Sequence, residues 1–311
     1  MLSAMSWGDL LETPWMGVSA VCPVSNSRAS GLSRDSHRKA CMSRETAILL
    51  LGDQLSWSHP ALQQADPETA VVILAEVCEE ASYVRHNRHK IALLFSAMRH
   101  FAEALSKHGY QVAYYPYEES LPSLLAACER AQEQWRYERL LICEPGEYRL
   151  LEQMRSWSDT LGVPIELLED TRFLASRQDF SDWASGRKQL RMEYFYRDMR
   201  KRYGILMDAD QPEGGKWNYD ADNRTGWREQ CEIPPRSKPE HDDITRAVIA
   251  IVEVAFPDHP GDLSTFRWTV THEAAQWSST GFVSTCCPPL APIRCAGRGV
   301  ALAFSRLISC T

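Results

Sequence analysis

The sequence lacks the patterns by which several large protein classes are recognised. The glycine-rich signatures of dinucleotide and P-loop phosphate binding are absent, as are the hydrolase pattern GxSxG and the zinc pattern HExxH. The ten cysteines include no CxxC pair and follow no secretory signal, which argues against a disulfide framework and against a metal site. We therefore assign no metal ligand to this chain.

Long apolar runs are absent too. None approaches the roughly 18 residues that a membrane-spanning helix needs, so we expect no membrane partner. The chain has 311 residues with 34 basic and 41 acidic side chains, a formal net charge of −7. This acidic balance argues against a generic nucleic-acid coat but leaves room for one basic face. The composition is that of an ordinary globular protein, and we expect a cytoplasmic monomer.

The two ends differ in composition from the middle. Residues 1–41 are rich in Ser, hold three acidic residues and show no period, so we expect a disordered or mistranslated leader with Met42 as the biological start. Residues 278–311 hold no Asp or Glu and four of the ten cysteines. Between them we expect an α/β domain over 42–175 and an interdomain helix and linker over 176–255.

The middle alternates between strand and helix patterns, which predicts an α/β fold with a parallel, Rossmann-like sheet. The predicted strands are 47–51, 70–75, 111–115, 139–143 and 165–168, and the predicted helices are 91–108, 121–134, 148–161 and 242–256. Gly109 is expected to end the first of these helices.

Polar residues follow three of the predicted strands, at 52–54, 76–80 and 144–147. Because ligands of such sheets bind at the carboxyl ends of the strands, these turns favour one shared pocket. Ordinary polar turns between strand and helix explain them equally well, and position alone leaves both interpretations open.

The stretch 185–203 combines many basic residues with interleaved aromatic ones. We interpret it as a helix in which Lys188, Arg191 and Arg202 share one side. Such a surface suits a nucleic-acid backbone and its bases, whereas the alternative is a solvated basic face on a core helix. A long polar connection, 208–240, follows it.

Taken together, several strings resemble the bacterial iron–sulphur photolyase and cryptochrome family. They are LLGDQLS (50–56), EVCEEASYVRHNRHKIALLFSAMRHFAEAL (76–105), EPGEYR (144–149), GRKQLRMEYFYRDMRKRYGILM (186–207), GGKWNYDADNR (214–224) and FPDHPGDLSTFRWTVT (256–271). The joint order and spacing of these strings is far more specific than any one of them, and they cover residues 45–275.

The resemblance implies an amino-terminal antenna domain that binds a ribityllumazine and a helical domain, beginning over 256–277, that binds FAD and a 4Fe–4S cluster. It implies damaged DNA as partner and light-dependent repair, with a (6-4) photolyase, a lyase, as the leading choice. The alternatives are a cryptochrome-type blue-light photoreceptor and a free-standing lumazine-binding module or inactive fragment.

Site residues carry over only where the strings match. The resemblance implies antenna-binding roles for Asp53, Gln54, Glu80, Tyr83 and Leu94. The residues that it implies for DNA are Arg187, Lys188, Arg191, Arg197, Arg200, Lys201, Arg202, Lys216 and Arg224.

The resemblance stops after 271–275. The residues 289–294 can be back-translated so that another reading frame gives Phe-Gly-Pro-Tyr-Gln, which is similar to the string expected next. We therefore expect 278–311 to be an out-of-frame tail and the flavin domain to be largely missing. No residue is assigned to FAD, to the cluster or to catalysis, and this chain is not expected to repair DNA alone.

Overall fold

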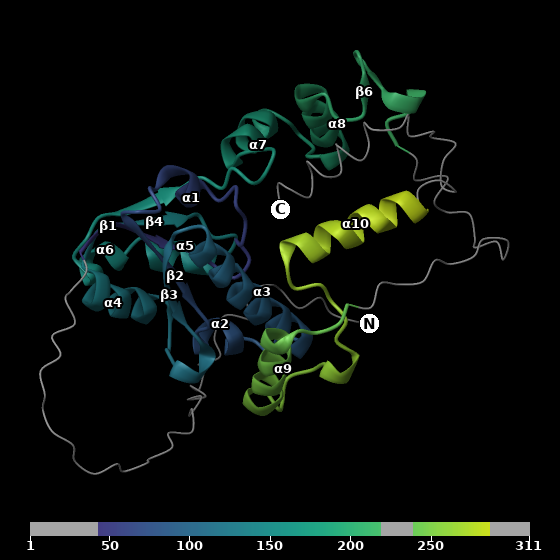
Figure 1. Ribbon diagram of the computed structural model, residues 1–311. Helices are drawn as coiled ribbons and strands as arrows, with labels where there is room; N and C mark the ends of the chain where they lie inside the picture. The colour runs from purple at the N-terminus through teal and green to yellow at the C-terminus, as the bar shows by residue number, and fades with distance from the viewer. Residues whose placement is uncertain (1–42, 219–238, 287–311) are drawn as a thin grey trace, which may run out of the picture. The chain divides into compact units, whose positions relative to one another are not determined.

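The computed structural model describes residues 43–218 and 239–286 (Figure 1). Its centre is a parallel five-stranded sheet in the order β3-β2-β1-β4-β5. The strands are β1 (Arg44–Leu49), β2 (Ala70–Ala75), β3 (Gln111–Tyr115), β4 (Tyr137–Cys143) and β5 (Ile165–Leu168). The predicted α/β class and parallel sheet are confirmed, and three of the five strands have the predicted bounds.

The strand sequences explain why this sheet is buried on both faces. All six residues of β2, AVVILA, are buried, as is usual for a parallel sheet covered on both sides. Successive side chains alternate between two apolar clusters: Val72 and Leu74 belong to one, and Val71 and Ile73 to the other.

Helices supply the opposite wall of each cluster. On one face these are α1 (Pro60–Gln64), α3 (Arg88–Lys107) and α9 (Asp243–Ala255). On the other face they are α4 (Leu124–Trp135), α5 (Tyr148–Met154) and α6 (Trp157–Leu161), and the short helix α2 (Cys78–Ser82) follows β2. The sheet is therefore doubly wound, which leaves its carboxyl edge open for a ligand.

Of the predicted helices, one ends as expected and another is divided in two. Helix α3 ends as predicted, since Gly109 has φ +91° and follows the C-cap residue His108. The predicted helix 148–161 is in fact two, because a turn at Arg155 and Ser156 interrupts it, and the Ser156 hydroxyl donates to the Gln153 carbonyl oxygen there (2.9 Å).

Helix α9 belongs to the core of the α/β unit although it lies far along the chain. Val248, Val252 and Phe256 are buried in the cluster that contains the apolar face of α3. The Phe256 ring lies 5.1 Å from that of Tyr117, and His100 of α3 lies 3.0 Å from Asp242 at the start of α9. The domain bounds at 175 and 255 stay a prediction, but α9 itself packs as part of the α/β unit.

The basic stretch is a shorter helix than predicted. Helix α7 (Arg177–Ala184) ends before Gly186, which has φ +73°, and α8 (Met192–Tyr203) begins only after Arg191, an N-cap residue in extended conformation. The expectation that Lys188 and Arg191 share a helical side with Arg202 is therefore wrong. The strands β6 (Met207–Asp208) and β7 (Gln211–Pro212) follow, and α10 (His272–Cys286) comes after α9.

Across the described ranges, no helix combines the length and apolar character that crossing a bilayer requires.

Candidate functional site

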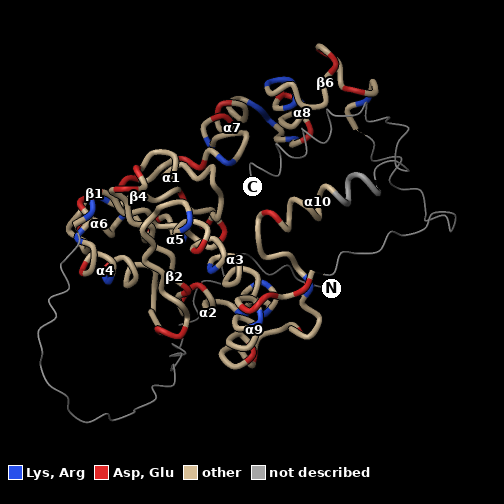
Figure 2. The backbone as a smooth tube through the Cα atoms, viewed as in Figure 1, with Lys and Arg blue, Asp and Glu red and all other residues tan. Residues whose placement is uncertain are grey.

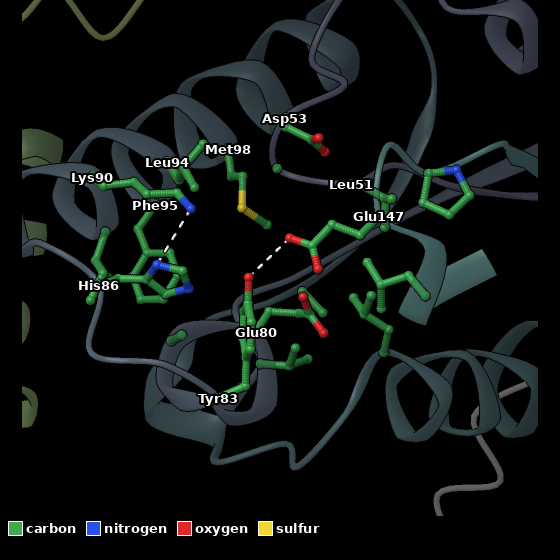
Figure 3. Close-up of a pocket in the computed structure, with 18 of the residues that line it drawn as sticks. Leu51, Asp53, Glu80, Tyr83, His86, Lys90, Leu94, Phe95, Met98 and Glu147 are labelled. Atoms are coloured by element: carbon green, nitrogen blue, oxygen red, sulfur yellow. Dashed lines mark hydrogen bonds between the residues drawn. The ribbon is translucent and has the colours of Figure 1, made fainter. Parts of the chain in front are cut away.

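A cavity opens at the carboxyl edge of the sheet, where the sequence predicts a pocket (Figure 3). Its empty space is about 890 Å³, counting the part open to solvent. The turn after β1, helices α2 and α3, and the turn after β4 all contribute to its lining. Segments that are far apart in the sequence therefore meet at one cavity.

One wall is apolar and comes from α3. Leu94 and Phe95 precede Met98 by four and three residues, about one helical turn, so both lie beside Met98 on the face of the helix that lines the cavity. Gly52 approaches this wall so closely that a Cβ atom there would lie 3.1 Å from the Met98 sulfur. Glycine in the turn after β1 therefore allows that turn to pass close to α3. The side chains of α3 leave an apolar surface on which a flat ring can pack.

Carboxylates form the opposite side, and one arginine ties them together. The Arg149 guanidinium donates to both oxygens of Glu80 (3.1 and 2.8 Å) and to Glu147 (3.1 Å). A third carboxylate, Glu79, lies 3.6 Å from the same guanidinium. These ion pairs hold the Glu80 carboxylate in one orientation at the cavity, and they raise the pKa of Arg149, so it remains charged.

Tyr83 is fixed against the same network. Its hydroxyl donates to Glu147 (3.0 Å), and the Arg149 guanidinium lies 4.5 Å from its ring centre. Burial and the Glu147 carboxylate raise the pKa of Tyr83. The phenol therefore stays protonated and acts as a donor to Glu147 at neutral pH.

Asp53 occupies the turn after β1, and its carboxylate is drawn at the cavity in Figure 3. Its backbone oxygen accepts a hydrogen bond from Arg172 (3.2 Å), and Arg172 is itself paired with Asp170 (2.5 Å). Within the described part of the chain, no hydrogen bond occupies the Asp53 carboxylate itself. It can therefore accept from an N–H group of a ligand.

His86 and Lys90 close another side of the cavity. The Lys90 ammonium donates to Nδ1 of His86 across 3.4 Å. Burial, the charge of Lys90 and the nearby His259 lower the pKa of His86. The imidazole is therefore neutral at pH 7, and Lys90 is the positive group on this side.

Gln54 is absent from the lining, in contrast to the other four predicted antenna residues. It is buried, and its amide nitrogen donates to the backbone oxygen of Glu144 (3.1 Å). His59 Nδ1 accepts from the Ala61 N–H, so its Nε2 carries the proton and donates to Gln54 Oε1 (3.4 Å). Gln54 thus joins the turn after β1 to that after β4 and positions the cavity wall.

The structure brings Asp53, Glu80, Tyr83 and Leu94 together around one cavity. The sequence-based assignment omits His86, Lys90, Met98 and Glu147, which line it as well. Two signals could have found them. Met98 follows Leu94 by one helical turn, and Glu147 lies in a polar turn that was already noted for its position after a strand.

A second feature is the basic segment around α8, where Lys and Arg gather (Figure 2). Several of these cations have internal partners: Arg202 pairs with Asp179 (2.6 Å), Arg197 with Glu193, and Arg187 donates to the Trp183 carbonyl oxygen (2.6 Å). Arg200 is buried and donates to the Ile205 carbonyl oxygen (3.1 Å). Some of the predicted DNA residues are therefore held by partners within the segment, and the others can contact a ligand.

Five cations between 185 and 203 are exposed: Arg187 and Arg202, whose partners are given above, and Lys188, Arg191 and Lys201, for which the described residues provide no ion pair. Lys201 lies 5.4 Å from the centre of the Trp217 ring, and Tyr194 and Tyr196 are exposed on the same helix. Lys216 is exposed beside Trp217, and Arg224 lies outside the described residues. Cations next to exposed rings can contact phosphates and bases of a single strand.

Within 43–218 and 239–286, no group of three or more His, Cys, Asp or Glu residues is arranged to hold a metal ion. Of the cysteines there, Cys128 and Cys143 are buried thiols inside the fold.

Comparison with known proteins adds an independent finding. Residues 48–268 match the family model of the deoxyribodipyrimidine photo-lyase-related proteins. A (6-4) photolyase of Agrobacterium fabrum is 42% identical over 243 residues, which cover 76% of this chain and 47% of that protein. An uncharacterized protein, R852, of Acanthamoeba polyphaga mimivirus is 30% identical over 146 residues, 46% of this chain and 73% of that protein. The chain thus spans about half the length of the first of these relatives.

Proposed function

The chain belongs to the deoxyribodipyrimidine photo-lyase-related protein family, and from this we propose that its α/β unit binds a light-harvesting chromophore for light-dependent DNA repair. The (6-4) photolyase that is 42% identical favours repair of (6-4) photoproducts over light sensing. A ribityllumazine is the proposed chromophore. FAD and a 4Fe–4S cluster are proposed for the complete repair enzyme of the iron–sulphur type, and none of the described residues is assigned to them.

One observation carries the proposal: residues from four separate turns and helices converge on a cavity with an apolar wall and a carboxylate rim. Such a wall, with a few convergent polar groups, fits a heteroaromatic ring whose edge carries N–H donors and carbonyl acceptors. The bound chromophore would supply light absorption and pass its excitation energy to the flavin.

The residues around the cavity would orient the ring. Leu94, Phe95 and Met98 offer apolar contact to its face. The Asp53 carboxylate, which has no hydrogen bond of its own among the described residues, would accept from a ring N–H. Glu80, held by Arg149, would accept from a second donor such as a ribityl hydroxyl.

The exposed cations near α8 are the proposed DNA contacts. Among the described residues, Lys188, Arg191 and Lys201 form none of the ion pairs that occupy Arg197 and Arg202. Phosphate contacts of this kind give affinity without sequence preference, which suits recognition of damage in any sequence context.

Chromophore binding can be tested with 6,7-dimethyl-8-ribityllumazine. We expect the full chain to retain this pigment at one equivalent through gel filtration, with a quenched or shifted fluorescence. Glu80→Ala is expected to weaken binding at least tenfold, because a hydrogen bond to a charged acceptor contributes about 1.5–3 kcal/mol.

Glu103→Ala is the matched control, since Glu103 is an exposed carboxylate of α3 that pairs with Lys107 and lies outside the lining of this cavity. Its affinity is expected to stay within about threefold of the unmodified chain, well under 1 kcal/mol. Full pigment occupancy in Glu80→Ala would contradict the assignment of the cavity.

A further inference from the structure

The balance of charge around the cavity is unequal. Asp53, Glu80 and Glu147 line it, and Glu79 adds a fourth carboxylate through Arg149. Against these stand two cations, Lys90 and Arg149. His86 adds no positive charge, because its lowered pKa keeps the ring neutral at pH 7. The six charged groups therefore leave a net negative charge at the cavity.

Of the two cations, Arg149 is already engaged by carboxylates. The Arg149 guanidinium is shared among Glu80 (2.8 Å), Glu147 (3.1 Å) and Glu79 (3.6 Å). The Lys90 ammonium lies 3.4 Å from the His86 ring nitrogen. Arg172, the basic residue nearest to the Asp53 turn, is paired with Asp170 at 2.5 Å. A phosphate or carboxylate entering the cavity therefore meets one cation that is not held by a carboxylate, Lys90, against three lining carboxylates.

The apolar wall does not distinguish charged from uncharged ligands. A ring that packs on Leu94, Phe95 and Met98 gains the same contact whether or not its side chain ends in a phosphate. Selection between two such ligands therefore falls to the charges, whose interactions with a partly buried anion are screened less than at an open surface.

We propose that this cavity selects an uncharged, polyhydroxylated heteroaromatic ligand and rejects its phosphorylated form, because Glu80 and Glu147 engage the nearby cation and leave the lining negative. The inference rests on the proposed function and narrows its ligand class. Specificity here comes from repulsion of the wrong ligand as well as from contact with the right one.

The test is a titration of the full chain with two matched probes, 6,7-dimethyl-8-ribityllumazine and its 5′-phosphate, followed by fluorescence anisotropy at low salt. We expect the phosphate ester to bind at least tenfold more weakly, a difference of about 1.4 kcal/mol. The ratio is expected to shrink at 0.5 M NaCl, since screening reduces charge repulsion.

Two variants locate the effect. Glu147→Gln removes one negative charge from the lining, keeps an acceptor for the Tyr83 hydroxyl and is expected to reduce the ratio several-fold. Glu152→Gln makes the same change in net charge farther along α5, at a residue outside the lining, and is expected to leave the ratio unchanged.

The outcomes separate the two proposals. Equal or tighter binding of the phosphate ester would overturn charge selection while leaving chromophore binding intact. A reduction in the ratio as large in Glu152→Gln as in Glu147→Gln would overturn the assignment to this cavity. If neither probe binds, the proposed function fails and the selectivity fails with it.

Discussion

The α/β unit and the segment 177–218 use their charged residues in opposite ways. In the α/β unit, several charges are held by one another inside the fold or at the cavity: Glu76 is buried and bound by Arg99, and Arg149 holds the carboxylates of the cavity. In the segment 177–218, only Phe195, Arg200 and Pro212 are buried, and most cations face solvent. The internally paired charges of the α/β unit stabilise the fold and orient the cavity, whereas the exposed cations of 177–218 can bind another molecule.

The largest expected effect is the loss of stability on replacing Glu76, the buried carboxylate of the α/β unit. Its carboxylate accepts from Arg99 (2.7 and 2.8 Å), from the Tyr114 hydroxyl and from the Tyr117 N–H (2.9 Å). Glu76→Ala leaves these donors without their acceptor, and we expect a loss of about 3–5 kcal/mol in the free energy of unfolding. Urea denaturation followed by circular dichroism measures it.

Glu118→Ala is the control for this prediction. Glu118 binds the same Arg99 (3.0 Å), but its side chain is about half exposed. Its removal is expected to cost less than about 1 kcal/mol. Equal effects of the two substitutions would show that burial does not separate the roles of these carboxylates.

The next largest effect concerns pH and His59, a buried residue of the α/β unit. Burial, together with the charge of Arg172, lowers the pKa of His59 from 6.5 to about 4. Between these values the unfolded chain binds the proton more readily than the folded one. Stability is therefore complete above pH 6.5 and falls as the pH drops toward 4. From pH 7 to pH 5 this group alone removes about 2 kcal/mol.

His59→Asn isolates that contribution, because Asn keeps an N-cap acceptor for α1 and does not titrate in this range. We expect the loss of stability between pH 7 and pH 5, measured by urea denaturation at both values, to be about 2 kcal/mol smaller in the variant. An identical pH dependence in both proteins would mean that His59 is not the group that titrates.

The smallest expected effect concerns the exposed cations of the segment 177–218 and their affinity for a nucleic acid. Replacing Arg191 and Lys201 by Gln removes two exposed cations. We expect affinity for a single-stranded oligonucleotide to fall about tenfold at low salt, with a salt-dependence slope smaller by about 1.4. Stability should be unchanged, and anisotropy titrations from 50 to 200 mM salt provide the measurement.

Lys107→Gln combined with Arg155→Gln is the matched control, since it removes two exposed cations from the α/β unit. If this pair lowers the affinity as much as the pair near α8, net charge rather than a defined surface accounts for the binding.

The sequence predicted the sheet well because its strands are short apolar runs bounded by polar turns. The run 70–75 is the clearest case, and its bounds match the observed strand. Helix α3 was also recognisable, since Ile91, Phe95, Met98 and Leu105 recur at helical spacing and Gly109 ends the pattern.

The rest depended on contacts that local patterns do not reveal. The break between α7 and α8 follows from the left-handed conformation of Gly186, whereas Met192, Phe195 and Met199 recur at helical spacing just after it. For the site, the resemblance indicated Gln54 as a ligand residue. Only the fold shows its amide bonded to the backbone of Glu144, 90 residues away.

The return of α9 to the α/β unit has a consequence for synthesis of the protein. The last strand of the sheet ends at Leu168, but Val248 and Val252, which cover the apolar face of α3, emerge from the ribosome about 80 residues later. At a translation rate of 5–20 residues per second, that face of α3 stays exposed for roughly 4 to 16 s before α9 has been synthesised. The nascent chain therefore exposes an apolar helix face for longer than local folding takes. We expect the α/β unit to be cleaved by protease in ribosome-bound chains stalled before residue 256 and to resist cleavage in chains stalled well after it.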